Sequence, residues 1–514
     1  MSVAAADELR LGELLAALSL AGDLANGMPL EKSMRTCLLA VSIGRELGLD
    51  DRVLSDTFFM TLLRAIGCTA FASEEAAAYG DDIAYRNTYF PVDFGSDSEV
   101  IAATQTNLAR DEPPNVRADA VQRFFAEGPR LAAEMATSAC SVAVRFSARL
   151  GMSDDVATSL THVWERWDGQ GFPAQLAEDA IAMPARLAHI SIVTEIDHRV
   201  SGRAAAIENV KRRRGGWFDP NLTDAFLGNA DALLAALEVG SVWDAVLDAE
   251  PSPRMTVAAQ NIDRVASAFG DFVDLKSPFT LGHSSGVARL AESAGAQIGV
   301  EPGVLQSAGC LHDLGAVSVS SSIWNKPGPL TMAEWERVRL HAYYTERILT
   351  QSPALASLAP IAGMHHERCD GTGYHRNAPG PILGTAARVL AAADVFQALT
   401  EPRPHRRALA AADAARVLND EAAAGHLDRE AVAAVLTVAG ERPAPAAWPA
   451  GLSDREVQVL RLLARGNTRK EIAAALFISP STVHTHTLHV YEKTGVSTRA
   501  AVALFAMEHD LLRD

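Results

Sequence analysis

Apolar residues recur every three or four positions along most of the chain, with polar residues between them. This spacing is typical of helices that bury one face. It predicts helices over Leu9–Leu24, Ser33–Leu47, Gly128–Leu150, Ser285–Ile298 and Ala386–Leu399. Stretches that alternate between apolar and polar residues are scarce, so we expect an all-α protein without a large sheet.

Two proline-containing stretches interrupt this helical pattern: Asp248–Arg254 (DAEPSPR) and Gly440–Gly451 (GERPAPAAWPAG). Such composition is typical of linkers. The length of 514 residues agrees with about three domains. We therefore predict a first domain over residues 1–250, a second over 251–440, a linker over 441–451 and a small third domain over 452–514.

The first two domains resemble each other. ERWDGQGFP (Glu165–Pro173) parallels ERCDGTGYH (Glu367–His375), and PARLAHISIVTEI (Pro184–Ile196) parallels AARVLAAADVFQA (Ala386–Ala398) at the same offset. Two matches in the same order indicate an internal repeat. We interpret the chain as an ancient duplication in which the first copy has decayed.

Composition restricts where the protein works and what it binds. The net charge of −17 excludes a general polyanion-binding protein, so any nucleic-acid site must be local. The sequence holds no run of 18 apolar residues, and its acidic start lacks the basic region of a signal peptide. Five widely spaced cysteines are typical of reduced thiols. We expect a cytoplasmic protein with no membrane contact.

Histidine and aspartate residues accumulate in the second domain, which holds eight of the fifteen histidines between His283 and His426. Imidazole and carboxylate ligands together favour a first-row divalent metal such as manganese, iron or zinc. Seven ligands are too many for one tetrahedral ion and suit two ions with open water positions. The candidate ligands are His283, His312, Asp313, His341, His365, His366 and Asp394. His312 and Asp313 point about 100° apart on a helix, so His312 can bind one ion while Asp313 bridges both.

Five motifs of this domain resemble the HD-GYP branch of the HD phosphohydrolases: KSPFTLGHS, CLHDLG, NKPGPLT, HHERCDGTGY and ADVFQALTEPRPHR. The resemblance implies an all-helical HD core, two metal ions, commonly iron or manganese, and hydrolysis of the phosphodiester of cyclic di-GMP. It also implies the same seven metal ligands. Lys326 and Arg403 stand in matching motifs as phosphate partners, with solvated surface charges as the alternative interpretation. We expect Asp313, Lys326 and Arg403 to carry the chemistry.

The chain departs from the family pattern at two positions of the second copy, where Ala316 replaces a lysine and His375 replaces the proline of GYP. The first copy departs at almost every ligand. Opposite the ligands stand Lys32, Arg64–Ala65, Val163–Trp164 and Ile192. We expect no metal there, and a packing or dimerisation role or, alternatively, a regulatory ligand site. The basic run Lys211–Gly216 is interpreted as a solvated loop.

The third domain carries strong helix-end signals. Ser453 and Glu456 form a capping-box pattern, a second helix is predicted over Arg469–Phe477, and Ser479–Pro480 suits the start of a third. On the third helix one face is apolar and the other is small and polar, which favours entry into a DNA major groove.

The sequence from Leu452 resembles the LuxR/GerE-type helix-turn-helix over its whole length. The resemblance implies a small tetrahelical DNA-binding domain, with two copies of it on a homodimer reading two half-sites. The alternative is a small helical interaction domain. The candidate DNA-binding residues are Arg469, Lys470, Thr482, His484, Thr485, His486, His489 and Lys493.

The sequence therefore predicts two tandem HD-type helical domains followed by a helix-turn-helix domain. The favoured function is a transcriptional regulator that hydrolyses a cyclic dinucleotide, with cyclic di-GMP as the expected substrate, and binds DNA. Two alternatives stay open: a nucleotide-sensing transcription factor without efficient turnover, and a hydrolase of another nucleotide or phosphate ester.

Overall fold

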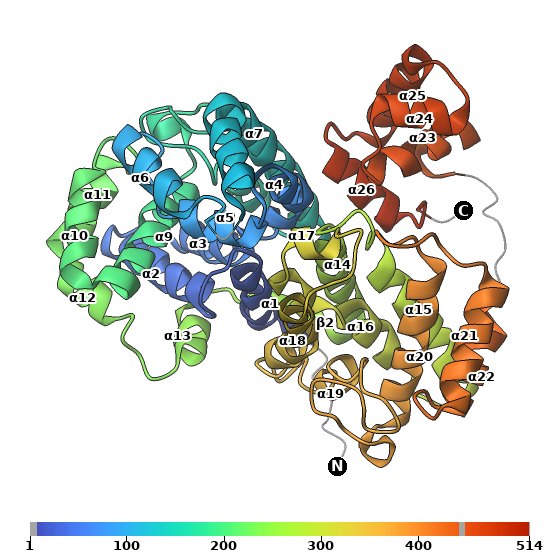
Figure 1. Ribbon diagram of the computed structural model, residues 1–514. Coiled ribbons are helices and arrows are strands. Elements are labelled where there is room, and N and C mark those ends of the chain that lie inside the picture. Colours follow the sequence, from blue (N-terminus) through green and yellow to red (C-terminus); the bar gives the residue numbers. More distant parts are fainter. Residues whose placement is uncertain (1–7, 111, 441–447, 513–514) are drawn as a thin grey trace. The chain divides into compact units, whose positions relative to one another are not determined.

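The computed structural model describes residues 8–110, 112–440 and 448–512. The chain forms two compact units, Met1–Ala259 and Gln260–Asp514, and each is described by itself. Helices dominate both units (Figure 1), and the two short strands found in the described residues form one antiparallel pair. The expected all-α class is confirmed.

Unit 1 is built from long helices joined by short turns. Its elements are β1 (Glu8–Arg10), α1 (Leu11–Ala25), α2 (Lys32–Glu46), α3 (Asp51–Leu63), η1 (Cys68–Phe71), α4 (Ala72–Tyr79), α5 (Asp82–Tyr89), α6 (Asp97–Asn107), α7 (Pro114–Arg149), α8 (Asp154–Thr161), η2 (Glu178–Ala180), α9 (Met183–Ser201), α10 (Arg203–Arg212), α11 (Pro220–Gly228), α12 (Ala230–Ala235), α13 (Val242–Ala249) and β2 (Thr256–Ala258). Helices α2, α3 and α9 pack together at its centre.

Two boundaries in unit 1 differ from the sequence expectation. Unit 1 extends beyond residue 250 because β2 pairs with β1 at the other end of the unit. Helix α7 begins at Pro114, before the predicted Gly128. Phe124 anchors the additional turns by packing against Tyr79 and Tyr89. Such a contact joins distant parts of the chain, so helical periodicity alone does not reveal it.

Unit 2 holds the second copy and the C-terminal domain. The helices of the second copy are η3 (Ala259–Asn261, at the boundary), α14 (Ile262–Asp274), α15 (His283–Gln297), α16 (Val304–Leu311), η4 (Leu314–Ser318), α17 (Ser321–Trp324), α18 (Met332–Leu349), α19 (Ala359–Ala362), η5 (Gly380–Ile382), α20 (Thr385–Thr400), α21 (Ala411–Ala423) and α22 (Arg429–Ala439). Helix α15 is central and packs against α16, α20 and α22.

The C-terminal domain begins after the predicted linker, of which residues 441–447 lie outside the described residues. Its elements are η6 (Pro449–Gly451), α23 (Asp454–Ala464), α24 (Arg469–Leu476), α25 (Pro480–Thr494) and α26 (Arg499–Glu508). The capping box of Ser453 and Glu456 forms as expected, and the Ser479 hydroxyl caps α25. Val459, Ile472 and Val483 close the small core between α23, α24 and α25.

The two copies share hydrogen bonds at matching positions. In the first copy the Asp23 carboxylate accepts bonds from the backbone N–H and hydroxyl of Ser33. In the second copy Asp274 accepts the same two bonds from Ser284. Each aspartate lies in the last turn of one helix and each serine in the first turn of the next. The duplicated unit therefore kept this joint after the ligands around it diverged.

The two copies also share a loop whose backbone N–H groups donate to a central glutamate. Glu165 accepts bonds from the backbone N–H groups of Ala174 and Leu176. Glu367 accepts them from two residues at the same spacing, Arg376 and Ala378. In each loop a glycine passes so close to the glutamate that an added Cβ would lie 2.4 Å from its Cα. The loop geometry thus requires glycine in both copies.

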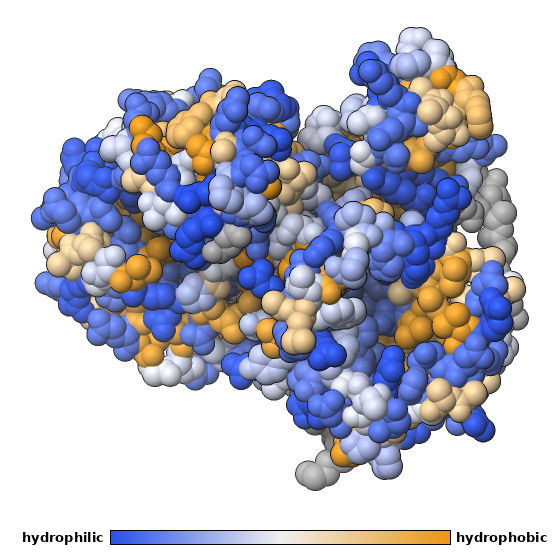
Figure 2. Space-filling view, viewed as in Figure 1, coloured by the Kyte–Doolittle hydropathy of each residue, from blue (hydrophilic) through white to orange (hydrophobic). Residues whose placement is uncertain are grey.

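Figure 2 shows polar side chains over most of the visible face, with apolar side chains in separate patches. Among the described residues, no single helix combines the length and apolar character needed to cross a membrane. One bent pair, Asp51–Leu63 with Cys68–Tyr79, meets those two requirements only when its helices are taken together.

Candidate metal centre

Five segments of the second copy deliver histidine and aspartate side chains to one place. His283 is the first residue of α15, and Asp394 lies within α20. His312 and Asp313 follow α16, His341 lies within α18, and the pair His365–His366 follows α19. Five of these seven side chains are at least 95% buried, while Asp313 and His366 are partly exposed. The cluster is therefore inside the domain with one accessible side.

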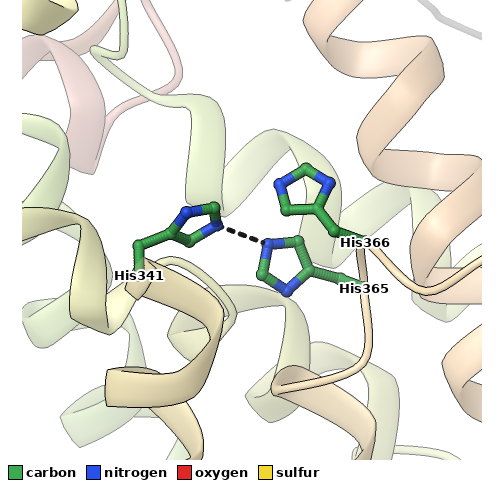
Figure 3. Close-up of side chains that lie close together, drawn as sticks. All are labelled: His341, His365 and His366. Carbon is green, nitrogen blue, oxygen red and sulfur yellow. Dashed lines mark hydrogen bonds between the residues drawn. The ribbon is translucent and has the colours of Figure 1, made fainter. Parts of the chain in front are cut away.

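All seven predicted metal ligands fall into three overlapping groups. The groups are His341 with His365 and His366, His283 with His312 and Asp313, and His312 with His365 and Asp394. Within each group the ligand atoms lie within 4.8 Å of one another. Figure 3 shows the rings of the first group facing a common point. Residues up to 111 positions apart in the sequence thus converge on one site.

The orientation of the rings leaves nitrogen lone pairs pointing inward. Nδ1 of His312, His341 and His365 each lies within hydrogen-bond distance of a carbonyl oxygen three residues earlier. A carbonyl accepts only, so each Nδ1 is the donor and, in a neutral ring, Nε2 keeps its lone pair. Helix backbone therefore fixes the tautomer that suits a metal ligand.

Two contacts indicate that a cation fits between these nitrogens. Nε2 of His341 lies 3.1 Å from Nε2 of His365, and two lone pairs at that distance need a positive charge between them. Nε2 of His312 is buried and has no hydrogen-bond partner among the described residues. An unpartnered buried nitrogen is costly unless a ligand satisfies it.

The two carboxylates lie between the histidines. Asp313 Oδ1 lies 3.3 Å from His341 Nε2 and 3.4 Å from His365 Nε2, while Oδ2 faces His312 at 3.6 Å. Asp394 Oδ1 lies 3.2 Å from His283 Nε2, and its Oδ2 lies 3.8 Å from His366 Nδ1. Each carboxylate therefore directs its two oxygens to different histidines, and both oxygens would be available to bound metal.

The electrostatics favour the ligand forms of the two carboxylates and of His312. Burial lowers the pKa of His283 and of His341, but the adjacent carboxylates outweigh it and raise both. Burial raises the pKa of the Asp313 carboxyl, but the neighbouring His312, His341 and His365 outweigh it and hold that pKa well below its usual range. The surrounding histidines also lower the pKa of Asp394 against its burial. Burial lowers the pKa of His312 to about 4. The carboxylates are therefore ionised and His312 is neutral at neutral pH.

The structure adds a residue that the sequence reasoning missed. Glu401 Oε2 lies 2.8 Å from Nδ1 of His283, and the Gln397 amide donates to Oε1 of the same carboxylate. Glu401 stands seven residues after Asp394, two helical turns along the same face. It orients His283 so that Nε2 faces Asp394. The motif ADVFQALTEPRPHR contained this signal, because the glutamate stands two residues before Arg403.

The two predicted cations have different surroundings. The Arg403 guanidinium lies 3.1 Å from Glu401 and 3.5 Å from His283, at the border of the cluster. The Lys326 ammonium instead contacts both carboxylate oxygens of Glu334, at 2.7 and 2.9 Å. Arg403 is therefore placed near the cluster, whereas Lys326 is held by the start of α18.

The first copy has no comparable cluster. In the described part of unit 1, no three histidine, cysteine or carboxylate ligand atoms gather within 4.8 Å. Lys32 and Arg64 are buried where the alignment places His283 and His312. The structure also pairs Ala139 with His341, since Gly67 packs on the carbonyl of Ala139 as Gly315 packs on that of His341. The repeat thus kept its backbone and lost its ligands.

The predicted DNA-binding residues do not all face solvent. Arg469, Lys470, Thr482, His484, Thr485 and His489 are exposed, whereas His486 is half-buried. The Lys493 ammonium donates to Glu456 at 2.7 Å and to the Gly451 carbonyl. The structure exposes Leu488 on α25, which the sequence analysis did not single out. Its side chain is one helical turn from His484.

Comparison with known proteins follows the same division of the chain. The HD domain profile matches residues 268–431, and the profile of bacterial regulatory proteins of the luxR family matches residues 450–506. These matches confirm both resemblances found in the sequence motifs.

Individual relatives extend the match into the first copy. The chain is 32% identical over 406 residues to the 3'3'-cGAMP-specific phosphodiesterase 3 of Vibrio cholerae serotype O1, covering 78% of this chain and 88% of that protein. A cyclic di-GMP phosphodiesterase of Pseudomonas aeruginosa is 29% identical over 218 residues, which is 41% of this chain and 52% of that protein. The crystal structure of the V. cholerae cyclic GMP-AMP-specific phosphodiesterase V-cGAP3 superposes with a TM-score of 0.59 at 27% identity, covering 85% of this chain and 99% of that chain.

Proposed function

We propose a function that starts from the family to which this chain belongs, the HD-domain cyclic-dinucleotide phosphodiesterases. The second copy hydrolyses the phosphodiester bond of a cyclic dinucleotide, and the C-terminal domain directs the protein to DNA. HD domains are metal-dependent phosphohydrolases. The observation that carries the proposal is the convergence of five histidines and two aspartates on one partly accessible site. The same site lies within the segment that matches the HD domain.

The residues present fit a pair of divalent transition ions. His283, His312, His341, His365 and His366 would supply nitrogen ligands, and Asp313 and Asp394 would supply oxygen ligands. Iron or manganese is favoured by this mixed ligand set, and zinc also suits it. When bound, such a pair supplies an activated water and neutralises charge on the phosphate.

The protein's own groups prepare the site for that chemistry. The helix carbonyls fix the tautomers of His312, His341 and His365, and Glu401 fixes the ring of His283. The Tyr374 ring lies against the ring of the partly exposed His366, with centroids 4.8 Å apart and the planes tilted by 32°. Arg403 stands beside His283, where a fixed cation stabilises the negative charge that builds on a phosphate.

The proposed substrates are 3'3'-cyclic dinucleotides. The match to the cGAMP-specific relative covers 78% of this chain, and this coverage makes 3'3'-cGAMP the first substrate to test. Cyclic di-GMP, the substrate expected from the sequence motifs, is the second, with support from the shorter match to the P. aeruginosa protein. The two differ in one purine base, so one assay compares them directly.

The C-terminal domain supplies the proposed DNA contact. Thr482, His484, Thr485 and Leu488 are exposed on α25, which suits base contacts in a major groove. Exposed Arg469 and Lys470 begin α24 and suit phosphate contacts. We place the protein in the cytoplasm as a homodimer, because a dimer presents two such helices to two half-sites.

One assay tests the enzyme half. Full-length protein purified without oxygen and loaded with manganese or iron is incubated with 3'3'-cGAMP and with cyclic di-GMP. We expect a linear dinucleotide or mononucleotides to form, and chelation to stop the reaction. A metal-loaded sample that leaves both compounds intact over a full time course contradicts the proposal.

A second function is favoured by one observation. Ala316 replaces the lysine of the family motif, is 6% exposed, and puts no cation beside Asp313. A site that binds the nucleotide and turns it over slowly would make the protein a nucleotide-sensing transcription factor. Operator binding measured with and without nucleotide, beside the hydrolysis assay, separates the two functions.

A further inference from the structure

The decayed first copy contains a cavity, partly open to solvent, at the place of the lost metal centre. The cavity has a volume of about 150 Å³. Five of its lining residues stand at positions that match metal ligands in the second copy: Arg64, Ala139, Val163, Trp164 and Ile192. The ligand-binding hollow of the repeat therefore survived the loss of every metal ligand.

The cavity is covered by a segment that is much longer in the first copy. Helices α4, α5 and α6 stand between η1 and α7, whereas the matching segment of the second copy holds only the short helix α17. Tyr85 and Tyr89 of α5, and Phe90 directly after it, line the cavity. Trp164, Phe172 and Trp217 add aromatic rings from other elements. The wall is thus shaped for a flat apolar body.

Three arginines line the described part of the cavity wall, and of these only Arg64 has no ion-pair partner. Arg86 forms an ion pair with Glu75, and Arg166 is paired with Asp93 and Asp168. Arg64 is only 5% exposed, its Nε has no hydrogen-bond partner among the described residues, and no described carboxylate lies within ion-pair distance of it. Its guanidinium carbon lies 4.5 Å from the Phe90 ring centroid. A buried cation without a partner is costly, so this arginine is a strong indication of an anionic ligand.

The neighbours of Arg64 support this view. Lys32 is the first residue of α2, next to Ser33 of the aspartate–serine joint. It is fully buried, and its Nζ has no hydrogen-bond partner among the described residues. It also lies 4.5 Å from the Phe90 centroid. The nearest carboxylates, Asp23 and Glu195, attract both side chains only at longer range. Asp23 accepts hydrogen bonds from Ser33, and Oε1 of Glu195 accepts one from Arg199. Two basic side chains thus stand where the second copy gathers ligands for metal cations.

We propose that the first copy binds a small aromatic anion, a single-ring carboxylate or phosphate, with its ring between the aromatic side chains and its charge on Arg64. The size of the cavity decides the class of ligand. A cavity of this volume holds one benzene-sized ring, and drug-sized ligands need several hundred cubic ångströms. A cyclic dinucleotide is therefore excluded, which separates this site from the substrate site of the second copy.

Para-fluorobenzoate and its neutral isostere para-fluorobenzamide are a matched pair of probes. Binding of each to the full-length metal-loaded protein is measured by fluorine NMR and by quenching of tryptophan fluorescence, since Trp164 and Trp217 line the cavity. We expect the carboxylate to bind with a Kd below ~1 mM and about tenfold more tightly than the amide. The benzoate signal must persist in Asp394→Asn, whose metal site is impaired, so failure here is distinguishable from failure of the proposed enzyme.

Two variants assign the binding to the cavity. Arg64→Met keeps the length of the side chain and removes its charge, and we expect it to abolish the preference for the carboxylate. Ala136→Leu fills the cavity from α7 and should weaken both probes. Arg52→Met, at an exposed arginine paired with Asp155, is the matched control and should bind like the wild type. Equal binding of acid and amide, no saturable binding of either, or an unchanged preference in Arg64→Met overturns the proposal.

Discussion

The two copies of the HD fold share a backbone and differ in what fills its centre. Both keep the aspartate–serine joint and the glutamate-centred loop. The second copy gathers five histidines and two aspartates, whereas the first places lysine, arginine and apolar side chains at the matching positions. The comparison teaches that the hydrogen bonds that shape this fold are separate from the ligands that give it chemistry. Fold and activity can therefore diverge independently within one chain.

The largest expected effect comes from removing a carboxylate from the candidate metal centre of the second copy. Asp313→Asn leaves one oxygen to face His341, His365 and His312, so we expect metal loss and a fall in kcat of roughly a thousandfold or more. Metal content and hydrolysis of 3'3'-cGAMP are measured on the same sample. Exposed Asp420→Asn is the control and should change neither. If the variant keeps its metal and its rate of hydrolysis, Asp313 is not a metal ligand, and the proposed difference between the copies is contradicted.

A smaller effect is expected at the glutamate that orients His283. Glu401→Gln keeps the size of the side chain and loses the carboxylate that contacts His283 Nδ1. Loss of such an orienting partner lowers metal affinity roughly 10- to 100-fold. We expect activity to fall at limiting metal and to recover as metal is added. An exposed change, Glu430→Gln, serves for comparison, and a defect that excess metal does not repair would argue against an orienting role.

The shared loop offers a paired test of the comparison. Glu165→Gln and Glu367→Gln each weaken acceptance of two backbone N–H groups, which should lower the free energy of unfolding by about 1–3 kcal/mol in either copy. Thermal unfolding measures this change. Only Glu367→Gln should also reduce hydrolysis, because its loop follows His365 and His366 directly. Loss of activity of equal size in both variants would mean that the first copy takes part in the chemistry.

The smallest effect is expected at Lys32. Burial lowers the pKa of this lysine well below its ordinary value, and its Nζ has no hydrogen-bond partner among the described residues. Lys32→Met keeps the packing, so we expect stability to change by less than about 1 kcal/mol or to rise. At the matching position, His283→Met should remove metal. Chemical denaturation of both variants measures the contrast, and a strongly destabilised Lys32→Met would indicate a structural role for the ammonium.

The sequence predicted most of the architecture because its signals are local. Helical spacing, capping residues and short sequence motifs each depend on residues within a few turns of one another. All seven candidate ligands, which were taken from such motifs, converge in the structure. The missed features depend on distant partners. Glu401 acts on His283 across 118 positions, and Lys493 is held by Glu456 across 37. The cavity beside Arg64 is lined by helices whose packing no motif encodes. Contacts of this kind become visible only in three dimensions.

Metal content per chain tests the central claim most directly. Full-length protein purified without oxygen is measured by elemental analysis beside Asp313→Asn and Arg64→Met. We expect about two transition-metal ions per wild-type chain, a marked loss in Asp313→Asn and no change in Arg64→Met, because, in the described residues, only the second of the two copies gathers such ligands. A folded wild-type protein that takes up no metal, or one whose metal survives Asp313→Asn, would contradict it.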